Sequence, residues 1–138
     1  MGCNQSRPTS APAFEEIRYQ ITFLLEHEII GELLITNNTL TILYLDNNNI
    51  TDVQSIGEGL KTNNTLTTLR LDNNNITDDS GIQSIIDVLK TNNTLIYLTL
   101  FNNQLSDNMK SQLKAIQQYK RDGSNGYQQV EEMEIRTW

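Results

Sequence analysis

Hydrophobic and polar residues alternate in the same order in three blocks of the chain. The blocks read TNNTLTILYLDNNNITD from Thr36, TNNTLTTLRLDNNNITD from Thr62 and TNNTLIYLTLFNNQLSD from Thr91. Each keeps the spacing L-x-x-L-x-L-x-x-N-x-L, with isoleucine as the last apolar residue in two blocks. Their first leucines are 26 and 29 residues apart, and self-similarity at about 20 to 50 residues is typical of solenoids. We therefore expect an array of stacked units.

The alternation inside each block predicts a short strand. Successive side chains of a strand point to opposite faces, so Leu43 and Leu45 are expected inward and their neighbours outward. Strands of neighbouring blocks then pair in parallel, and the inward leucines stack on one another. The outward positions are Ile42, Tyr44 and Asp46 in the first block, Thr68, Arg70 and Asp72 in the second, and Tyr97, Thr99 and Phe101 in the third.

One asparagine of each block, Asn48, Asn74 or Asn103, falls where the chain turns away from the strand. A buried amide there can satisfy backbone groups of the loop with its donors and its acceptor. We therefore predict a structural role for these asparagines.

Apolar residues at helical spacing follow each block and predict one helix per unit, the last ending near Lys120. Similar spacing before the first block predicts an N-terminal capping helix over residues 14–35. Residues 36–120 are expected to hold the three repeats, residues 1–13 to be a flexible N-terminus, and residues 121–138 to form a C-terminal cap or tail. The helix-forming positions are Val53, Ile56 and Leu60, then Ile82, Ile85 and Leu89, then Met109, Leu113 and Ile116.

The three blocks resemble the leucine-rich repeat, and their period of about 28 residues resembles its ribonuclease-inhibitor-like subtype. The resemblance implies an α/β fold: a short right-handed β-α superhelix with a parallel sheet on the concave face and helices on the convex face. It also implies a non-catalytic protein-protein interaction module. The same subtype occurs in GTPase-activating proteins, so regulation of a small GTPase is an alternative.

Charge and composition narrow the range of partners. The net charge of −7 disfavours nucleic acid, because phosphate contacts need clustered Lys and Arg. No stretch of the sequence reaches the length of a membrane-spanning helix, and the N-terminus lacks a secretory signal peptide. We expect a monomer that binds a protein on its concave face through the nine outward residues named above.

The first six residues fit the pattern for N-myristoylation on Gly2, and Cys3 beside it could carry palmitate. One myristoyl chain gives only marginal membrane binding, so a stable anchor needs the second acyl group. The sequence therefore predicts a lipid-anchored protein on the cytoplasmic face of a membrane, with lipidation at Gly2 and Cys3.

Little in the sequence supports catalysis. His27 is the only histidine, and no nucleophile, phosphate loop or Cys/His metal set accompanies it. Asp46 and Asp72 align across two strands, but a calcium ion needs six to eight oxygens, roughly, and Phe101 ends the row. We expect no catalytic residue, no metal and no cofactor.

Six N-x-[ST] sequons leave a further alternative open. If the chain were a fragment of a longer receptor, it could be an extracellular recognition domain carrying glycans. We favour the cytoplasmic interpretation, since the sequons follow from a repeat built on Asn and Thr.

Overall fold

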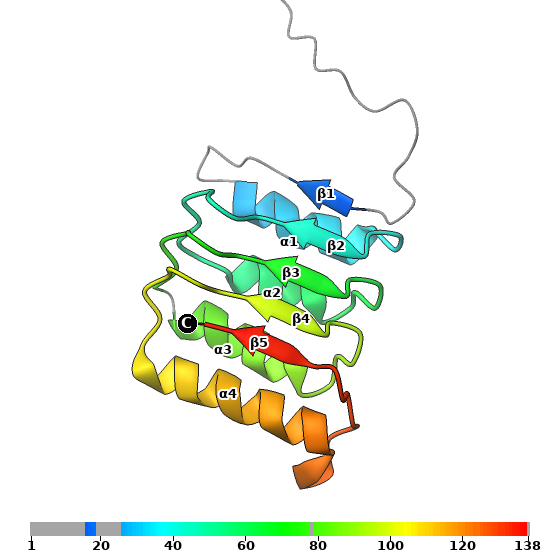
Figure 1. Ribbon diagram of the computed structural model, residues 1–138. Coiled ribbons are helices and arrows are strands. Elements are labelled where there is room, and N and C mark those ends of the chain that lie inside the picture. Colours follow the sequence, from blue (N-terminus) through cyan, green and yellow to red (C-terminus); the bar gives the residue numbers. More distant parts are fainter. Residues whose placement is uncertain (1–15, 19–25, 78, 138) are drawn as a thin grey trace, which may run out of the picture.

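The fold is a stack of strand-turn-helix units. A computed structural model describes residues 16–18, 26–77 and 79–137, and the side chains from Glu28 onward. The strands lie side by side in chain order, and the helices cover one face of the sheet in the same order (Figure 1). The elements are β1 (Glu16–Arg18), α1 (Glu26–Thr36), β2 (Ile42–Tyr44), α2 (Gln54–Leu60), β3 (Thr68–Arg70), α3 (Asp79–Leu89), β4 (Tyr97–Thr99), α4 (Asp107–Asp122), the 3-10 turn η1 (Ser124–Gly126) and β5 (Glu134–Arg136).

The sheet is parallel throughout, and its register follows the sequence repeat. Leu43 of β2 lies opposite Leu69 of β3, which lies opposite Leu98 of β4. All three leucines are fully buried, so the inward and outward assignment made from the alternation is confirmed at these positions. The predicted architecture, a short α/β solenoid with a parallel sheet on one side and helices on the other, is the one observed.

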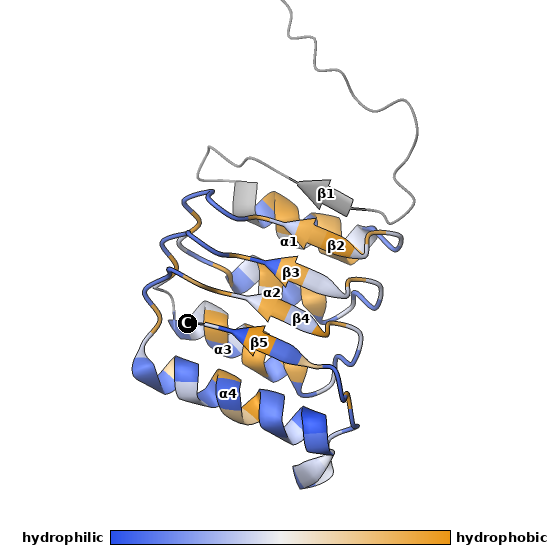
Figure 2. Cartoon of the chain, in the orientation of Figure 1, coloured by the Kyte–Doolittle hydropathy of each residue, from blue (hydrophilic) through white to orange (hydrophobic). Residues whose placement is uncertain are grey.

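The core lies between the sheet and the helices. Helix residues Ile56, Ile82 and Leu113 are as deeply buried as the strand leucines they pack with. Strands β2 to β5 each carry a hydrophobic segment and the described part of α1 is largely hydrophobic, whereas the connecting turns are mostly hydrophilic (Figure 2). Each fully buried aliphatic side chain stabilises the fold by about 1.5 to 3 kcal/mol. A single unit cannot bury its apolar side chains alone, so each unit depends on its neighbours for its stability.

Helices α1 and α2 approach closely because glycine stands where they meet. A Cβ on Gly59 would lie 2.7 Å from the Gly31 carbonyl oxygen and 2.8 Å from the Leu34 Cβ. A Cβ on Gly31 would lie 2.6 Å from the Ser55 carbonyl oxygen. Both glycines are buried, so this contact has no room for a larger residue.

The N-terminal region differs from the predicted capping helix over residues 14–35. Glu16–Arg18 form strand β1, which pairs with β2 so that Ile17 lies opposite Leu43. Helix α1 begins only at Glu26. The physical reason is that Ile17 precedes Leu43 by 26 residues, the same offset as between Leu43 and Leu69, so β1 continues the repeat.

The C-terminal segment adds a further strand to the sheet. Strand β5 pairs with β4, placing Ile135 opposite Leu98, and Ile135, Met133 and Val130 join the core. Of the two alternatives for residues 121–138, the described part packs over the last repeat as a cap would. No helix among the described residues is long and apolar enough to cross a bilayer.

Candidate functional site

The concave face of the sheet carries the outward side chains predicted to bind a partner. Because the strands pair in register, these residues form rows across the sheet. The first row contains Ile42, Thr68, Tyr97 and Glu134, the second contains Tyr44, Arg70, Thr99 and Arg136, and Asp46, Asp72 and Phe101 follow the strand ends. We call this set the concave face.

Arg70 lies at the centre of the concave face and links three of its neighbours. Its Nη2 is 2.9 Å from Asp46 Oδ2, and its Nε is 3.5 Å from Asp72 Oδ2. Its guanidinium carbon lies 5.1 Å from the centroid of the Tyr44 ring, within cation-π distance. The side chain is still 40% exposed. Arg70 is therefore held in place while part of its surface remains available to a partner.

Arg136 repeats this arrangement at the C-terminal end of the sheet. Its guanidinium carbon lies 5.8 Å from the Tyr97 ring centroid, and its guanidinium pairs with Glu134. Neither Glu134 nor Arg136 was among the residues predicted from the sequence. The signal that could have found them is the tripeptide Glu134-Ile135-Arg136, which places an apolar residue before arginine as Thr68-Leu69-Arg70 does.

Two of the nine predicted residues, Asp72 and Thr99, are buried and satisfied within the protein. Thr99 Oγ1 donates to Asp72 Oδ2 at 2.8 Å, and the Phe101 backbone N–H donates to Asp72 Oδ1 at 2.7 Å. They are 5% and 2% exposed, respectively. Their outward position does not expose them, because they bond to each other and, through Asp72, to the Phe101 backbone. These two residues therefore support the concave face rather than offer contact area to a partner.

The turn asparagines have the predicted structural role. Asn74 donates through Nδ2 to the carbonyl oxygens of Leu45 at 3.0 Å and Leu71 at 2.9 Å. Its Oδ1 accepts from the backbone N–H groups of Asn48 at 2.9 Å and Ile50 at 3.0 Å. Asn74 thereby ties its own unit to the preceding one, and Asn103 makes the same connection from the next unit.

A second asparagine ladder, which the sequence reasoning missed, runs along the loops before the strands. Asn63 Nδ2 donates to the carbonyl oxygens of Leu34 and Asn37, 2.9 and 3.1 Å away. Asn92 Nδ2 makes the equivalent bonds to Leu60 and Asn63, both at 3.1 Å. The invariant TNNTL spacing of the three blocks was the available signal for this ladder.

Lys120 ends the second ladder. Its Nζ donates to the carbonyl oxygens of Leu89 at 2.6 Å and Asn92 at 2.7 Å, and to Asn93 Oδ1 at 2.7 Å. If the ladder continued for one more unit, the asparagine of that unit would donate to the first two of these acceptors. Burial lowers the pKa of Lys120, whereas three oxygen acceptors stabilise its ammonium form. The described contacts thus assign Lys120 to closing the array.

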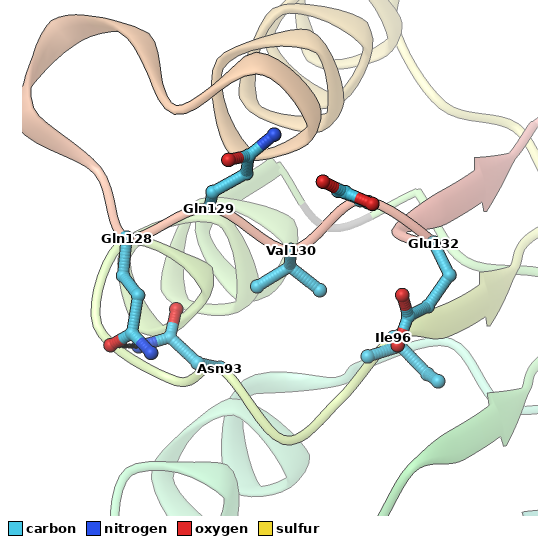
Figure 3. A pocket seen from close by; sticks show the side chains of 7 residues that line it. Asn93, Ile96, Gln128, Gln129, Val130 and Glu132 are labelled. Atoms are coloured by element: carbon cyan, nitrogen blue, oxygen red, sulfur yellow. Dashed lines mark hydrogen bonds between the residues drawn. The ribbon is translucent and has the colours of Figure 1, made fainter.

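A shallow groove separates the third unit from the C-terminal segment (Figure 3). Asn93 and Gln128 meet at one end of it, where Asn93 Nδ2 donates to Gln128 Oε1 at 2.9 Å, and Val130 points into its middle. Its volume is about 360 Å³. The lining combines amides, the carboxylates of Glu131 and Glu132, and the apolar Ile96 and Val130. This composition suits weak surface contact.

The described side chains of the concave face provide polar and aromatic contacts. No group of three His, Cys, Asp or Glu residues within residues 28–77 and 79–137 could hold a metal ion. The predicted lipidation sites Gly2 and Cys3, and the side chain of His27, lie outside the described residues. The concave face offers a partner two arginine-tyrosine pairs, together with the apolar side chains of Ile42 and Phe101.

Comparison with known proteins agrees with this architecture. Two segments of the chain, residues 39–59 and 65–87, match the sequence model of the Leucine Rich Repeat family. Among solved structures, "Leiomodin-1 Actin-Binding Site 2 (ABS2)" is similar at 24% sequence identity, with a TM-score of 0.64, over 91% of this chain and 70% of that one. A likeness at this identity concerns the fold. No curated protein matches the chain in sequence.

Proposed function

We propose that the chain, two segments of which match the leucine-rich repeat model, is a leucine-rich repeat protein and a non-catalytic module that binds a protein partner through its concave face. The observation that carries this proposal is the pair of arginine-tyrosine contacts on that face, Arg70 with Tyr44 and Arg136 with Tyr97. Tyrosine and arginine are enriched in interface hot spots, and a held side chain loses less conformational entropy on binding.

Exposure and charge on the concave face favour a polar protein surface as the partner. Arg70 is 40% exposed, and its partner Asp46 is less exposed than the arginine. The arginine side chain is therefore the more accessible half of the ion pair, while the tyrosine rings provide apolar contact. A partner segment with an acidic residue beside an apolar side chain would match both features.

Binding to the concave face is tested by affinity capture with three forms of the protein. We expect the Tyr44→Ala, Arg70→Ala, Tyr97→Ala triple variant to lose the partner that the wild type captures, while its circular dichroism spectrum shows that it remains folded. The matched control is Lys61→Ala on the exposed surface of α2, which should capture normally. Loss of capture in Lys61→Ala but not in the triple variant would place the binding surface on the helical face.

Actin is a partner that can be tested directly, since the similar solved structure is named as an actin-binding site. Its 24% identity carries over no binding residue. Co-sedimentation of the wild type and of the triple variant with filamentous actin answers the question. Pelleting of the wild type alone would identify actin, and absence of pelleting would leave the concave face to another protein.

The finer assignment to the ribonuclease-inhibitor-like subtype is also part of this proposal. Units of 26 and 29 residues that each hold a strand and an α-helix support it. We further propose that the protein acts as a monomer at the cytoplasmic face of a membrane, held there by acyl groups on Gly2 and Cys3.

The anchor is tested by fractionating cells that express wild-type, Gly2→Ala and Cys3→Ser forms, with metabolic labelling by acyl analogues. Gly2→Ala should be unlabelled and cytosolic, because myristoylation needs an N-terminal glycine. Cys3→Ser should carry myristate but partition weakly, because one chain gives an association constant of only about 10⁴ M⁻¹. A wild-type protein that is unlabelled and fully soluble would rule out the anchor and leave the concave-face proposal intact.

A further inference from the structure

The exposed surfaces of α2 and α3 carry the same polar triplet. In α2, Glu58 accepts from Gln54 Nε2 at 3.1 Å and pairs with Lys61 Nζ at 2.7 Å. In α3, Asp87 Oδ1 accepts from Gln83 Nε2 at 3.1 Å and from Lys90 Nζ at 2.9 Å. The hydrogen bond from the lysine lowers the pKa of the acid in both helices. In both helices the acidic residue thus has a glutamine one turn before it and a lysine three residues after it.

Helix α1 departs from this triplet at both donor positions. Alignment of the repeats puts Glu32 where Glu58 and Asp87 stand, Ile35 where the lysines stand, and Glu28 where the glutamines stand. Glu32 therefore has a second carboxylate one turn before it and an isoleucine after it. Ile35 is 51% exposed, although the other repeats place a solvated lysine at this position.

These three residues line a groove of about 340 Å³ between α1 and α2. Gly31 and Ser55 also line it, and a Cβ on Gly31 would lie 2.6 Å from the Ser55 carbonyl oxygen, so α1 and α2 are in close contact there. Of the groove's other two carboxylates, Asp52 accepts from the Gln54 backbone N–H, and Glu58 is bound to Lys61. Glu28 and Glu32 are thus the two carboxylates of the groove that lack the donor that the repeat pattern would supply, and Ile35 lines the same groove.

We propose that the groove between α1 and α2 is a second docking site, for a segment of a partner protein that carries a lysine or arginine next to an aliphatic side chain. The cation would pair with Glu32, as the missing lysine would, and would be attracted by Glu28 one turn earlier, and the aliphatic group would cover Ile35. Charge complementarity selects this chemistry, since two adjacent carboxylates repel an acidic segment and attract a basic one. The site lies on the helical side, opposite the concave face.

The full-length protein allows a direct test with synthetic peptides of alternating lysine and leucine, or of alternating glutamate and leucine, as probes. The lysine peptide should bind the wild type and shift the amide NMR signals of α1 and α2, whereas the glutamate peptide should not bind. Ile35→Lys restores the repeat triplet, so it should fill the site with its own cation and weaken binding about tenfold or more.

The matched control for Ile35→Lys is Ser111→Lys on the exposed surface of α4, which adds the same charge away from the groove. It should change the affinity for the lysine peptide less than about twofold, because charges farther apart than the Debye length are screened. If both variants weakened the binding of the lysine peptide equally, the effect would come from net charge alone, and the proposal would be overturned. Peptide-induced shifts confined to the strands, or to residues of the chain's own N-terminal segment, would also overturn it.

Discussion

At the scale of single residues, asparagine amides hold the units together. The turns place Asn47, Asn49, Asn73 and Asn102 at positive φ, a backbone region that asparagine tolerates better than most residues. The buried asparagines then join the backbone of one unit to that of the next. The asparagine-rich composition of the blocks is thus a consequence of their geometry.

Asn74→Asp should lower the free energy of unfolding by more than any single change on the concave face. The aspartate would lose the two donors that reach Leu45 and Leu71, and would set a carboxylate against their carbonyl oxygens. An unsatisfied buried polar group costs about 1 to 3 kcal/mol, and a charged one more. Urea denaturation measures the loss. A Thr68→Ala variant that unfolds as early as Asn74→Asp would contradict the account.

Lys120→Met should also destabilise the fold, although it keeps a side chain of similar length. The carbonyl oxygens of Leu89 and Asn92 would lose their donor in a buried setting, at a cost of about 1 to 3 kcal/mol. Lys114→Met, at an exposed position of the same helix, is the control and should unfold like the wild type. Equal denaturation midpoints for the two variants would show that closing the ladder contributes nothing.

At the scale of elements, the sequence predicts the inner units well and the ends poorly. The L-x-x-L-x-L alternation gives β2, β3 and β4 directly, because the same leucines are buried in every copy. Strand β1 was mistaken for helix, since one isoleucine between charged residues carries little periodic signal. Strand β5 has the same weakness, and the burial of Lys120 depends on long-range packing that no local pattern encodes.

Gly59→Ala should lower the melting temperature, even though alanine has the higher helix propensity by about 1 kcal/mol. The added methyl would lie 2.7 Å from the Gly31 carbonyl oxygen, so α1 and α2 would have to separate. Overpacking of this kind costs about 1 to 3 kcal/mol. Ser111→Ala, an exposed helical change, should leave the melt unchanged or raise it. A stabilised Gly59→Ala variant would refute the proposed close contact.

The sequence predicts where the concave-face residues lie, but only partly which of them are exposed to a partner. Register alone placed Tyr44, Arg70 and Tyr97 on one face. The alternation could not show that Asp72 and Thr99 are buried, because that depends on hydrogen bonds between the segments of two neighbouring strands, β3 and β4. Nor could it identify Arg136, whose strand is not part of a full repeat.

At the scale of the whole molecule, helix α4 closes the array at its C-terminal edge. Gln117 Oε1 accepts from the Ile135 backbone N–H, and Arg121 Nε donates to the Met133 carbonyl oxygen at 2.6 Å. These side chains bond to one backbone group of β5 and one just before it, so neither group is left to pair with a further strand, which protects the edge from pairing with another chain. The described surfaces left for a partner are therefore the concave face and the helical side.

Site-specific photo-crosslinking tests the central claim, that the concave face binds the protein partner, most directly. A photoreactive phenylalanine analogue would replace Thr68 in the middle of the concave face in one variant, and exposed Glu58 on α2 in another. Since a crosslink forms only within a few ångströms, we predict a crosslinked complex from position 68 that Arg70→Ala abolishes, and a different set of products or none from position 58. The same partner crosslinked from position 58 and absent from position 68 would contradict the account.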